Sequence, residues 1–147
     1  MPFSVGTIAI GSDHRARHIV DAIAQHLEPM GWTVHKEYGG DAESVDYPDV
    51  AKNVTSHIAS GQAVCGILIC GSGIGMSMAA NKVCGIRAAW VHEPVAAEMS
   101  RRHNNANVLC MAADGPIDSD FNKIVDVWLS TDFEGGRHQR RIAIFDS

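Results

Sequence analysis

The chain has 147 residues, of which 46% are hydrophobic and 20% are charged, and its formal net charge is −5 at pH 7. This length and apolar content predict a single domain over residues 1–147 with a substantial core. The acidic balance argues against nucleic acid or an anionic membrane as a partner, and no run is apolar for long enough to span a bilayer. The N-terminus lacks the features of a signal peptide, so we expect a cytoplasmic protein with reduced cysteines.

Short apolar runs alternate with segments of helical periodicity along the whole chain. The runs predict five strands, at Thr7–Ile10, Trp32–His35, Cys65–Ile69, Ile86–Val91 and Asn107–Met111. Between and after them, helical spacing of apolar residues predicts helices around 20–27, 50–58, 76–80, 95–99 and 121–129. Strands that alternate with helices pair in parallel, so we predict an α/β fold, a three-layer α/β/α sandwich around a five-stranded parallel sheet of Rossmann-like type.

A cysteine and a glycine-rich turn, Cys70 followed by Gly71–Gly75, come directly after the third strand. Glycine allows backbone N–H groups to converge, and a helix behind the turn adds positive dipole, so the turn suits a phosphate or an enediolate oxygen. The same field favours the thiolate form of Cys70. The alternative is a tight connection without chemistry, since the turn matches neither the dinucleotide fingerprint nor the lysine-containing P-loop. The remaining cysteines are expected to act as small core residues: Cys65, Cys84 and Cys110.

Ligands of parallel α/β sheets bind at the carboxyl ends of the strands. This rule places Asp13 and His14, which follow the first strand, at the same edge as Cys70. A role for Ser12 or Asp13 as a helix cap is the alternative. The polar loop from Tyr38 to Asp46 is long enough to reach over such a site.

Two further clusters carry groups suited to chemistry. His103 and Asn104 precede the fifth strand, and a histidine both donates and accepts protons near neutral pH. The segment Glu134–Arg141 contains three arginines in an acidic protein, and arginine suits phosphate recognition, although a solvated basic tail is the alternative. His14 and His18 are four residues apart but lack a further ligand at metal-binding spacing, so no metal site is predicted.

The order of these motifs resembles that of the ribose-5-phosphate isomerase B family, which also includes isomerases of galactose 6-phosphate and allose 6-phosphate. The resemblance runs nearly end to end. It rests on the following segments: Gly11-Ser12-Asp13-His14, Asp46-Tyr47-Pro48, Cys70-Gly71-Ser72-Gly73-Ile74-Gly75-Met76, Ala79-Ala80-Asn81-Lys82, Gly85-Ile86-Arg87-Ala88, His103-Asn104, Asn107-Val108-Leu109 and Glu134-Gly135-Gly136-Arg137-His138.

The resemblance implies an aldose–ketose isomerase that acts through an enediolate without a cofactor or metal. Ribose 5-phosphate and ribulose 5-phosphate are the leading substrate pair, and a four-carbon pair, a tetrulose 4-phosphate and erythrose 4-phosphate from polyol catabolism, is the alternative. It also implies a homodimer, or a tetramer built from such dimers, with each site shared between two subunits.

The same resemblance assigns roles to individual residues. Cys70 is the base that moves the proton between C1 and C2, a task that some members give to a glutamate at the position of Met76. His103, with Asp13 and Ser72, helps to open the sugar ring. The substrate-binding set comprises the turn residues that hold the enediolate oxygen, the phosphate ligands, and Asn104 on a sugar hydroxyl: Gly71, Gly73, Ile74, Gly75, His14, Arg137, His138, Arg141 and Asn104.

One position departs from the family pattern. Several members carry an arginine after the fifth strand that reaches the phosphate region of the partner's site, whereas this chain has Asp114, whose charge is expected to repel a nearby phosphate. A different class of function, a non-catalytic α/β ligand-binding module, would explain the fold and the glycine turn. Such a module would not need Cys70, His103 and the arginine cluster together.

Overall fold

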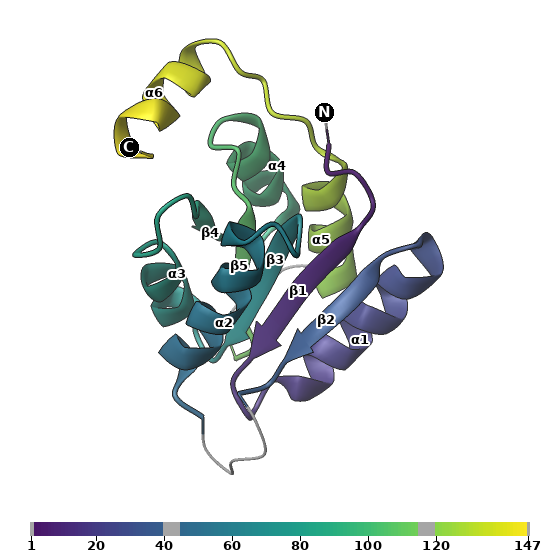
Figure 1. Ribbon diagram of the computed structural model, residues 1–147. Coiled ribbons are helices and arrows are strands. Elements are labelled where there is room, and N and C mark those ends of the chain that lie inside the picture. The colour runs from purple at the N-terminus through teal and green to yellow at the C-terminus, as the bar shows by residue number, and fades with distance from the viewer. Residues whose placement is uncertain (1, 40–44, 115–119, 147) are drawn as a thin grey trace.

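The computed structural model describes residues 2–39, 45–114 and 120–146. Within them, five parallel strands form one sheet in the order β2-β1-β3-β5-β4 (Figure 1). The strands are β1 (Thr7–Ser12), β2 (Thr33–Glu37), β3 (Cys65–Cys70), β4 (Ala88–Trp90) and β5 (Val108–Ala112). Because all strands run the same way, their carboxyl ends lie along one edge of the sheet and their amino ends along the other.

Helices cover both faces of this sheet. They are α1 (Arg17–Leu27), α2 (Tyr47–Ala59), α3 (Ile74–Ala80), α4 (Pro94–Arg102), α5 (Phe121–Ser130) and α6 (Arg137–Phe145), with a short 3₁₀ turn at Glu28–Met30. The predicted α/β/α sandwich with a five-stranded parallel sheet is therefore confirmed. No helix among the described residues is long and apolar enough to cross a membrane.

Alternation along the strands divides the core into two layers. Ile8 and Ile10 of β1 join one apolar cluster with α1, α4 and α5, whereas Ala9 between them joins the cluster formed with α2 and α3. Successive side chains of a strand point to opposite faces, so a buried strand must be apolar on both sides. In β3 all six residues are buried accordingly.

The helices follow the apolar stripes of the sequence. In α1 the predicted stripe is fully buried, and in α5 the side chain of Asp120 caps the first turn by accepting a hydrogen bond from the Lys123 amide at 2.7 Å. Pro48 lies in the first turn of α2, where its missing N–H costs nothing.

Several local predictions were wrong. Strand β4 is shorter than predicted, because the Ile86 amide donates to the Val83 carbonyl in a turn instead of joining the sheet. Cys84 lies in that same connection and is exposed, not a core residue. Helix α6 was not predicted, because its only buried residues are His138 and Ile142, too few to give a periodic apolar stripe.

Candidate active site

The thiol of Cys70 lies at the carboxyl end of β3, inside the glycine turn. Its side chain is buried, with 6% of the residue exposed, and its Sγ accepts a hydrogen bond from the amide of Gly73 at 3.2 Å. Helix α3 begins at the next residue, Ile74. The amide therefore fixes the position of the sulfur at the start of the turn.

Two positions of the turn leave little room for a side chain, and Gly73 also requires glycine for its backbone conformation. Gly73 has a φ of 76°, and a Cβ there would lie 2.8 Å from the backbone carbon of Met111 on β5. A Cβ on Gly75 would lie 2.6 Å from the ring of Tyr47. The turn is therefore wedged between β5 and the start of α2, which holds the thiol in place.

Ser72 lies at the exposed tip of the turn. Its Oγ accepts a hydrogen bond from the amide of Ile74 at 3.2 Å, and its carbonyl accepts one from Nε1 of Trp90 at 2.7 Å. Two of the amides assigned to the enediolate oxygen, those of Gly73 and Ile74, are thus used within the turn itself.

The residues after β1 lie beside this turn, as predicted. The amide of Asp13 donates to the carbonyl of Ile69 on β3 at 3.2 Å. Its carboxylate accepts hydrogen bonds from the amides of Arg15 and Ala16, at 3.0 and 3.2 Å, in the turn that precedes α1. The N-cap of α1 is Ala16, so the capping interpretation of Ser12 or Asp13 is wrong. His14 is exposed, and its Nδ1 accepts from the amide of Val45 at 3.4 Å.

Asp114 borders the same edge. Its amide donates to the carbonyl of Gly71 at 3.0 Å, and its carboxylate forms a short ion pair with the guanidinium of Arg15. A Cβ on Gly71 would lie 2.5 Å from that guanidinium, so the ion pair covers the glycine turn. Residues 40–44 of the loop predicted to reach over the site lie outside the described residues.

A second group of predicted site residues gathers around His103 and His138. Their rings stack with centroids 4.4 Å apart and an interplanar angle of 15°. His138 is buried, and its Nε2 lies 3.5 Å from a carboxylate oxygen of Glu134 without a hydrogen-bond partner among the described residues. Glu134 is held by Arg102, whose Nε donates to it at 2.6 Å. An unpaired buried ring nitrogen suits an incoming oxygen of a ligand.

Positive charge dominates this second group. Arg137 and Arg141 lie one turn apart on the exposed side of α6, and neither forms an ion pair within the described part of the chain. Burial lowers the pKa of His138, and positive charge on His103 and Arg137 lowers it further. The Arg102 guanidinium likewise holds the pKa of Glu134 below its usual value. The group therefore favours an anion.

The two groups lie at opposite edges of the sheet. Cys70 pairs with Ala112 at the carboxyl end of β5, whereas His103 precedes the amino end of that strand, Val108. Four residue steps of a strand span about 13 Å. Figure 1 shows α6 beyond the end where the strands begin, and its last residues are tied there by an ion pair between Arg87 and Asp146 at 2.7 Å. One small sugar cannot touch both groups of one chain.

A cavity of about 550 Å³ lies beside the second group. Asn104, the end of α6 and the connection from α3 to β4 line it, and Cys70 is not among its lining residues. This places the side chain assigned to a sugar hydroxyl in a concave surface at the amino edge of the sheet.

The four cysteines differ in reactivity. Burial raises the pKa of both Cys65 and Cys110, so these two remain thiols. Cys84 is exposed at the turn before β4 and lines the cavity that also contains Asn104. Cys70 alone combines a thiol with the glycine turn.

Four residues close to the two groups received no role from the sequence. They are Arg15, Tyr47, Trp90 and Glu134. Tyr47 and Glu134 belong to segments that carried the family resemblance, so the sequence could have indicated that they lie near the site. Arg15 and Trp90 act through partners distant in the sequence, and no local pattern indicates such contacts.

Comparison with known proteins identifies this arrangement. The family model described as Ribose/Galactose Isomerase matches residues 8–145. The chain belongs to the ribose/galactose isomerase family. Its members include the ribose-5-phosphate isomerase B of Escherichia coli, 42% identical over 135 residues that cover 92% of this chain and 91% of that protein. The predicted resemblance is therefore confirmed.

Other members of the ribose/galactose isomerase family extend the comparison. The D-erythrulose-4-phosphate isomerase of Pectobacterium atrosepticum is 40% identical over 131 residues, covering 88% of this chain and 86% of that protein. The solved structure of ribose-5-phosphate isomerase B from Mycoplasma genitalium with bound ribulose-5-phosphate superposes with a TM-score of 0.89 at 41% identity. It covers 98% of this chain, and 96% of its own chain is matched.

Proposed function

We propose that this protein interconverts ribose 5-phosphate and ribulose 5-phosphate, with Cys70 as the base. The observation that carries the proposal is the buried thiol that accepts a hydrogen bond from the Gly73 amide, in a chain whose relatives include a ribulose-5-phosphate complex. The reaction moves one proton between adjacent carbons and leaves the oxidation level of the molecule unchanged overall.

The chemistry needs one base that reaches both carbons. The Cys70 thiolate removes the proton from C2 of the open-chain aldose, and the C–H electrons form the C1–C2 double bond while the carbonyl oxygen becomes negative. The same thiol then delivers the proton to C1, the hydroxyl proton on O2 passes to O1, and the electrons left on O2 make the C2 carbonyl as the double bond supplies the new C1–H bond. Ser72 and the amides of Gly71–Gly75 that remain free of the turn's own hydrogen bonds stabilise the enediolate oxygen.

The remaining groups bind and prepare the substrate. Asp13 and His103 act with Ser72 in opening the furanose ring, since an acid and a base are both required there. His14, Arg137, His138 and Arg141 hold the phosphate, and Asn104 holds a hydroxyl. The phosphate supplies binding energy that orients the two reacting carbons.

We also propose that the working unit is a homodimer with shared sites. The distance between the two groups in one chain, at opposite edges of the sheet, supports this proposal. In a two-fold dimer, the Cys70 edge of one subunit faces the His103 edge of its partner, and the symmetry creates two equal sites. The thiol base requires reducing surroundings, which is consistent with a cytoplasmic enzyme.

The test of the base is Cys70→Ala, compared with Cys84→Ser as the matched control. Removal of a general base lowers kcat by about 10²–10⁴-fold, while the phosphate ligands remain and KM changes little. The Cys84→Ser variant should keep wild-type kcat. Near-normal turnover by Cys70→Ala would show that another group moves the proton.

Subunit complementation tests the shared site. Cys70→Ala and His103→Asn are each expected to be inactive, but a heterodimer of the two contains one site with both wild-type residues. Exchange should therefore restore up to half of the wild-type activity per heterodimer. If exchange is verified by mass and activity does not return, each site takes both residues from the same chain.

A four-carbon substrate is the second candidate. One observation favours it: the Pectobacterium relative acts, by its name, on D-erythrulose 4-phosphate. The family resemblance adds that Asp114 stands where an arginine is expected in several members. A direct comparison of sugar lengths decides between the two candidates.

A further inference from the structure

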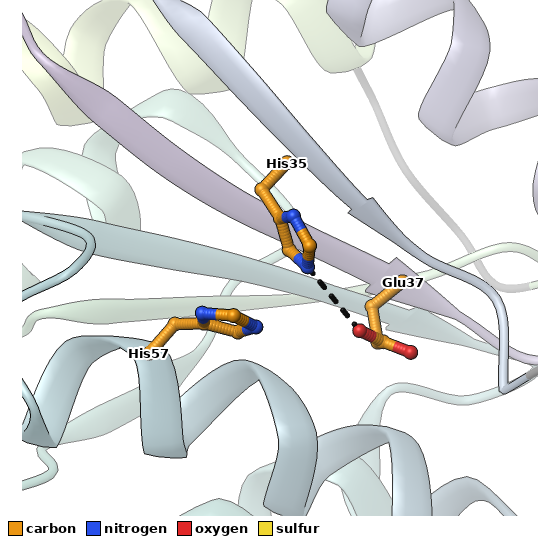
Figure 2. Close-up of side chains that lie close together, drawn as sticks. All are labelled: His35, Glu37 and His57. Atoms are coloured by element: carbon orange, nitrogen blue, oxygen red, sulfur yellow. Dashed lines mark hydrogen bonds and ion pairs between the residues drawn. The ribbon is translucent and has the colours of Figure 1, made fainter.

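Three side chains with metal-binding atoms meet on the face of the sheet covered by α2, away from both groups described above. His35 and Glu37 come from the edge strand β2, and His57 comes from α2 (Figure 2). Strand residues two apart point to the same face, so β2 presents its imidazole and carboxylate side by side. No local pattern in the sequence indicates this cluster, because His57 is twenty residues from Glu37 and lies on another element.

The spacing of the donor atoms is close to that of a metal site. Nε2 of His35 lies 3.3 Å from Oε2 of Glu37, and the ring centroids of His35 and His57 are 4.2 Å apart. One donor atom from each residue lies within 4.8 Å of the other two. Tetrahedral Zn²⁺ with bonds of about 2.0–2.1 Å places its ligands about 3.4 Å apart, so rotations that move the atoms by about 1 Å complete the geometry.

An outer contact prepares His57 for this role. Its Nδ1 lies 2.8 Å from Oε1 of Gln62. A carbonyl oxygen only accepts hydrogen bonds, so Nδ1 carries the proton and the neutral ring keeps a lone pair on Nε2. Figure 2 shows the second ring nitrogen of His57 directed toward Glu37. Histidines that bind metals are commonly oriented in this way by a partner of the other nitrogen.

The charge around the cluster also suits a cation. Lys36, between the two strand ligands, points to the opposite face and pairs with Asp21 at 3.0 Å. The cluster is accessible, since the side chains of His35 and Glu37 are 42% and 22% exposed. The other group of similar composition, His103 with Glu134 and His138, differs because Arg102 occupies its carboxylate and Arg137 and Arg141 stand nearby.

We propose that His35, Glu37 and His57 bind a divalent transition metal of the Zn²⁺ type, with water as the fourth ligand. Two imidazoles and one carboxylate are a donor set that Zn²⁺ accepts with an open position. The metal ties the edge strand β2 to α2. The cluster shares no residue with the isomerase site, so the metal adds stability and takes no part in the proton transfer.

The test uses full-length protein freed of metal by a chelator and titrated with ZnCl₂ by calorimetry, with the bound metal counted by elemental analysis. We expect one Zn²⁺ per chain. His35→Asn and His57→Asn should abolish this binding, and Gln62→Ala, which removes the outer contact, should weaken it about 10–100-fold. At a free Zn²⁺ concentration of one hundred times Kd, the wild-type Tm should rise by about 5–10 °C.

Two control variants test whether zinc binds to other exposed side chains instead of to the proposed cluster. His18→Asn removes an exposed imidazole from α1, and Cys84→Ser removes the exposed thiol; both should bind one Zn²⁺ with wild-type affinity. Isomerase activity of the His57→Asn variant should equal that of the wild type without metal, which also shows that the variant is folded. The proposal is overturned if no saturable binding occurs, if both histidine variants bind as the wild type does, or if Cys84→Ser alone removes the metal.

Discussion

The guanidinium of Arg15 forms an ion pair with the carboxylate of Asp114, across 99 positions of sequence. Arg15 belongs to the turn after β1 and Asp114 follows β5, and the pair closes over Gly71. The negative charge of Asp114 is therefore balanced within the same subunit. The expected repulsion between Asp114 and a phosphate is reduced accordingly.

This pairing predicts opposite effects from its two members. Asp114→Asn frees the positive charge of Arg15 and should lower KM for a phosphorylated sugar, whereas Arg15→Gln leaves Asp114 unbalanced and should raise it. Both side chains are more than half exposed, so each change should be about two- to fivefold. Measurement of KM at low and high salt checks this, because screening should shrink both effects. Equal KM values for the wild type, Asp114→Asn and Arg15→Gln would show that the ion pair does not influence phosphate binding.

Thiol modification should report on Cys70 only after Cys84 is removed. Cys84 is exposed and open to alkylating reagents, whereas Cys70 is 6% exposed. In a Cys84→Ser background, we expect one alkylation per chain that parallels the loss of activity, and a saturating sugar phosphate should slow it. Mass spectrometry identifies the modified residue. Inactivation without modification of Cys70 would contradict its role.

The arginines of α6 should affect binding through the phosphate. Arg137→Ala and Arg141→Ala each remove a charge-assisted contact worth about 1.5–3 kcal/mol, which corresponds to a loss of about 10–150-fold in affinity. Arg140→Ala, on the same helix, is the matched control. Sugars without a phosphate should bind all variants alike. Equal losses for phosphorylated and unphosphorylated sugars would mean that the helix has been disturbed instead.

The pKa of His138 should lie below 6.5 in the free enzyme and rise when phosphate binds. Burial favours its neutral form, and His103 and Arg137 add to this effect. The unfolded chain binds the proton more readily, so the contribution of His138 to stability is complete above pH 6.5 and is lost as pH falls through the lowered pKa. NMR titration of the imidazole with and without inorganic phosphate measures both values, and Arg137→Ala should raise the first. A free-enzyme pKa at or above 6.5 would contradict the structure.

Local patterns were sufficient to predict the layers of the fold. The alternation around Ala9 in β1 and the stripe in α5 depend on residues two to four positions apart, which a sequence displays directly. The same patterns did not predict an element that buries few apolar side chains. Helix α6 buries only His138 and Ile142, so its stability depends on contacts with distant parts of the chain.

The sequence indicated which residues belong to the site, but it did not indicate which of them contact one another. Cys70 and its glycine turn are contiguous, and their geometry follows from a strand that ends where a helix begins. The stacking of His103 on His138 and the pairing of Arg15 with Asp114 depend on tertiary packing, for which no periodicity exists. The separation of the Cys70 group from the His103 group became clear only from the structure, in which the two lie at opposite ends of β5.

Sugar length is the property that the relatives leave open, since the two named above act on substrates of different length and are 42% and 40% identical. We expect ribose 5-phosphate to be preferred, because Arg15 balances Asp114 and Arg137 and Arg141 remain for the phosphate. Specificity constants for tetrose 4-phosphates, pentose 5-phosphates and hexose 6-phosphates, measured under one set of conditions, check this. A tetrose phosphate preferred by tenfold or more, about 1.4 kcal/mol in transition-state binding, would overturn the choice. In that case Asp114→Arg should move the preference toward the pentose, since it adds a phosphate ligand and also releases Arg15. If the ratio stays the same, Asp114 does not determine substrate length.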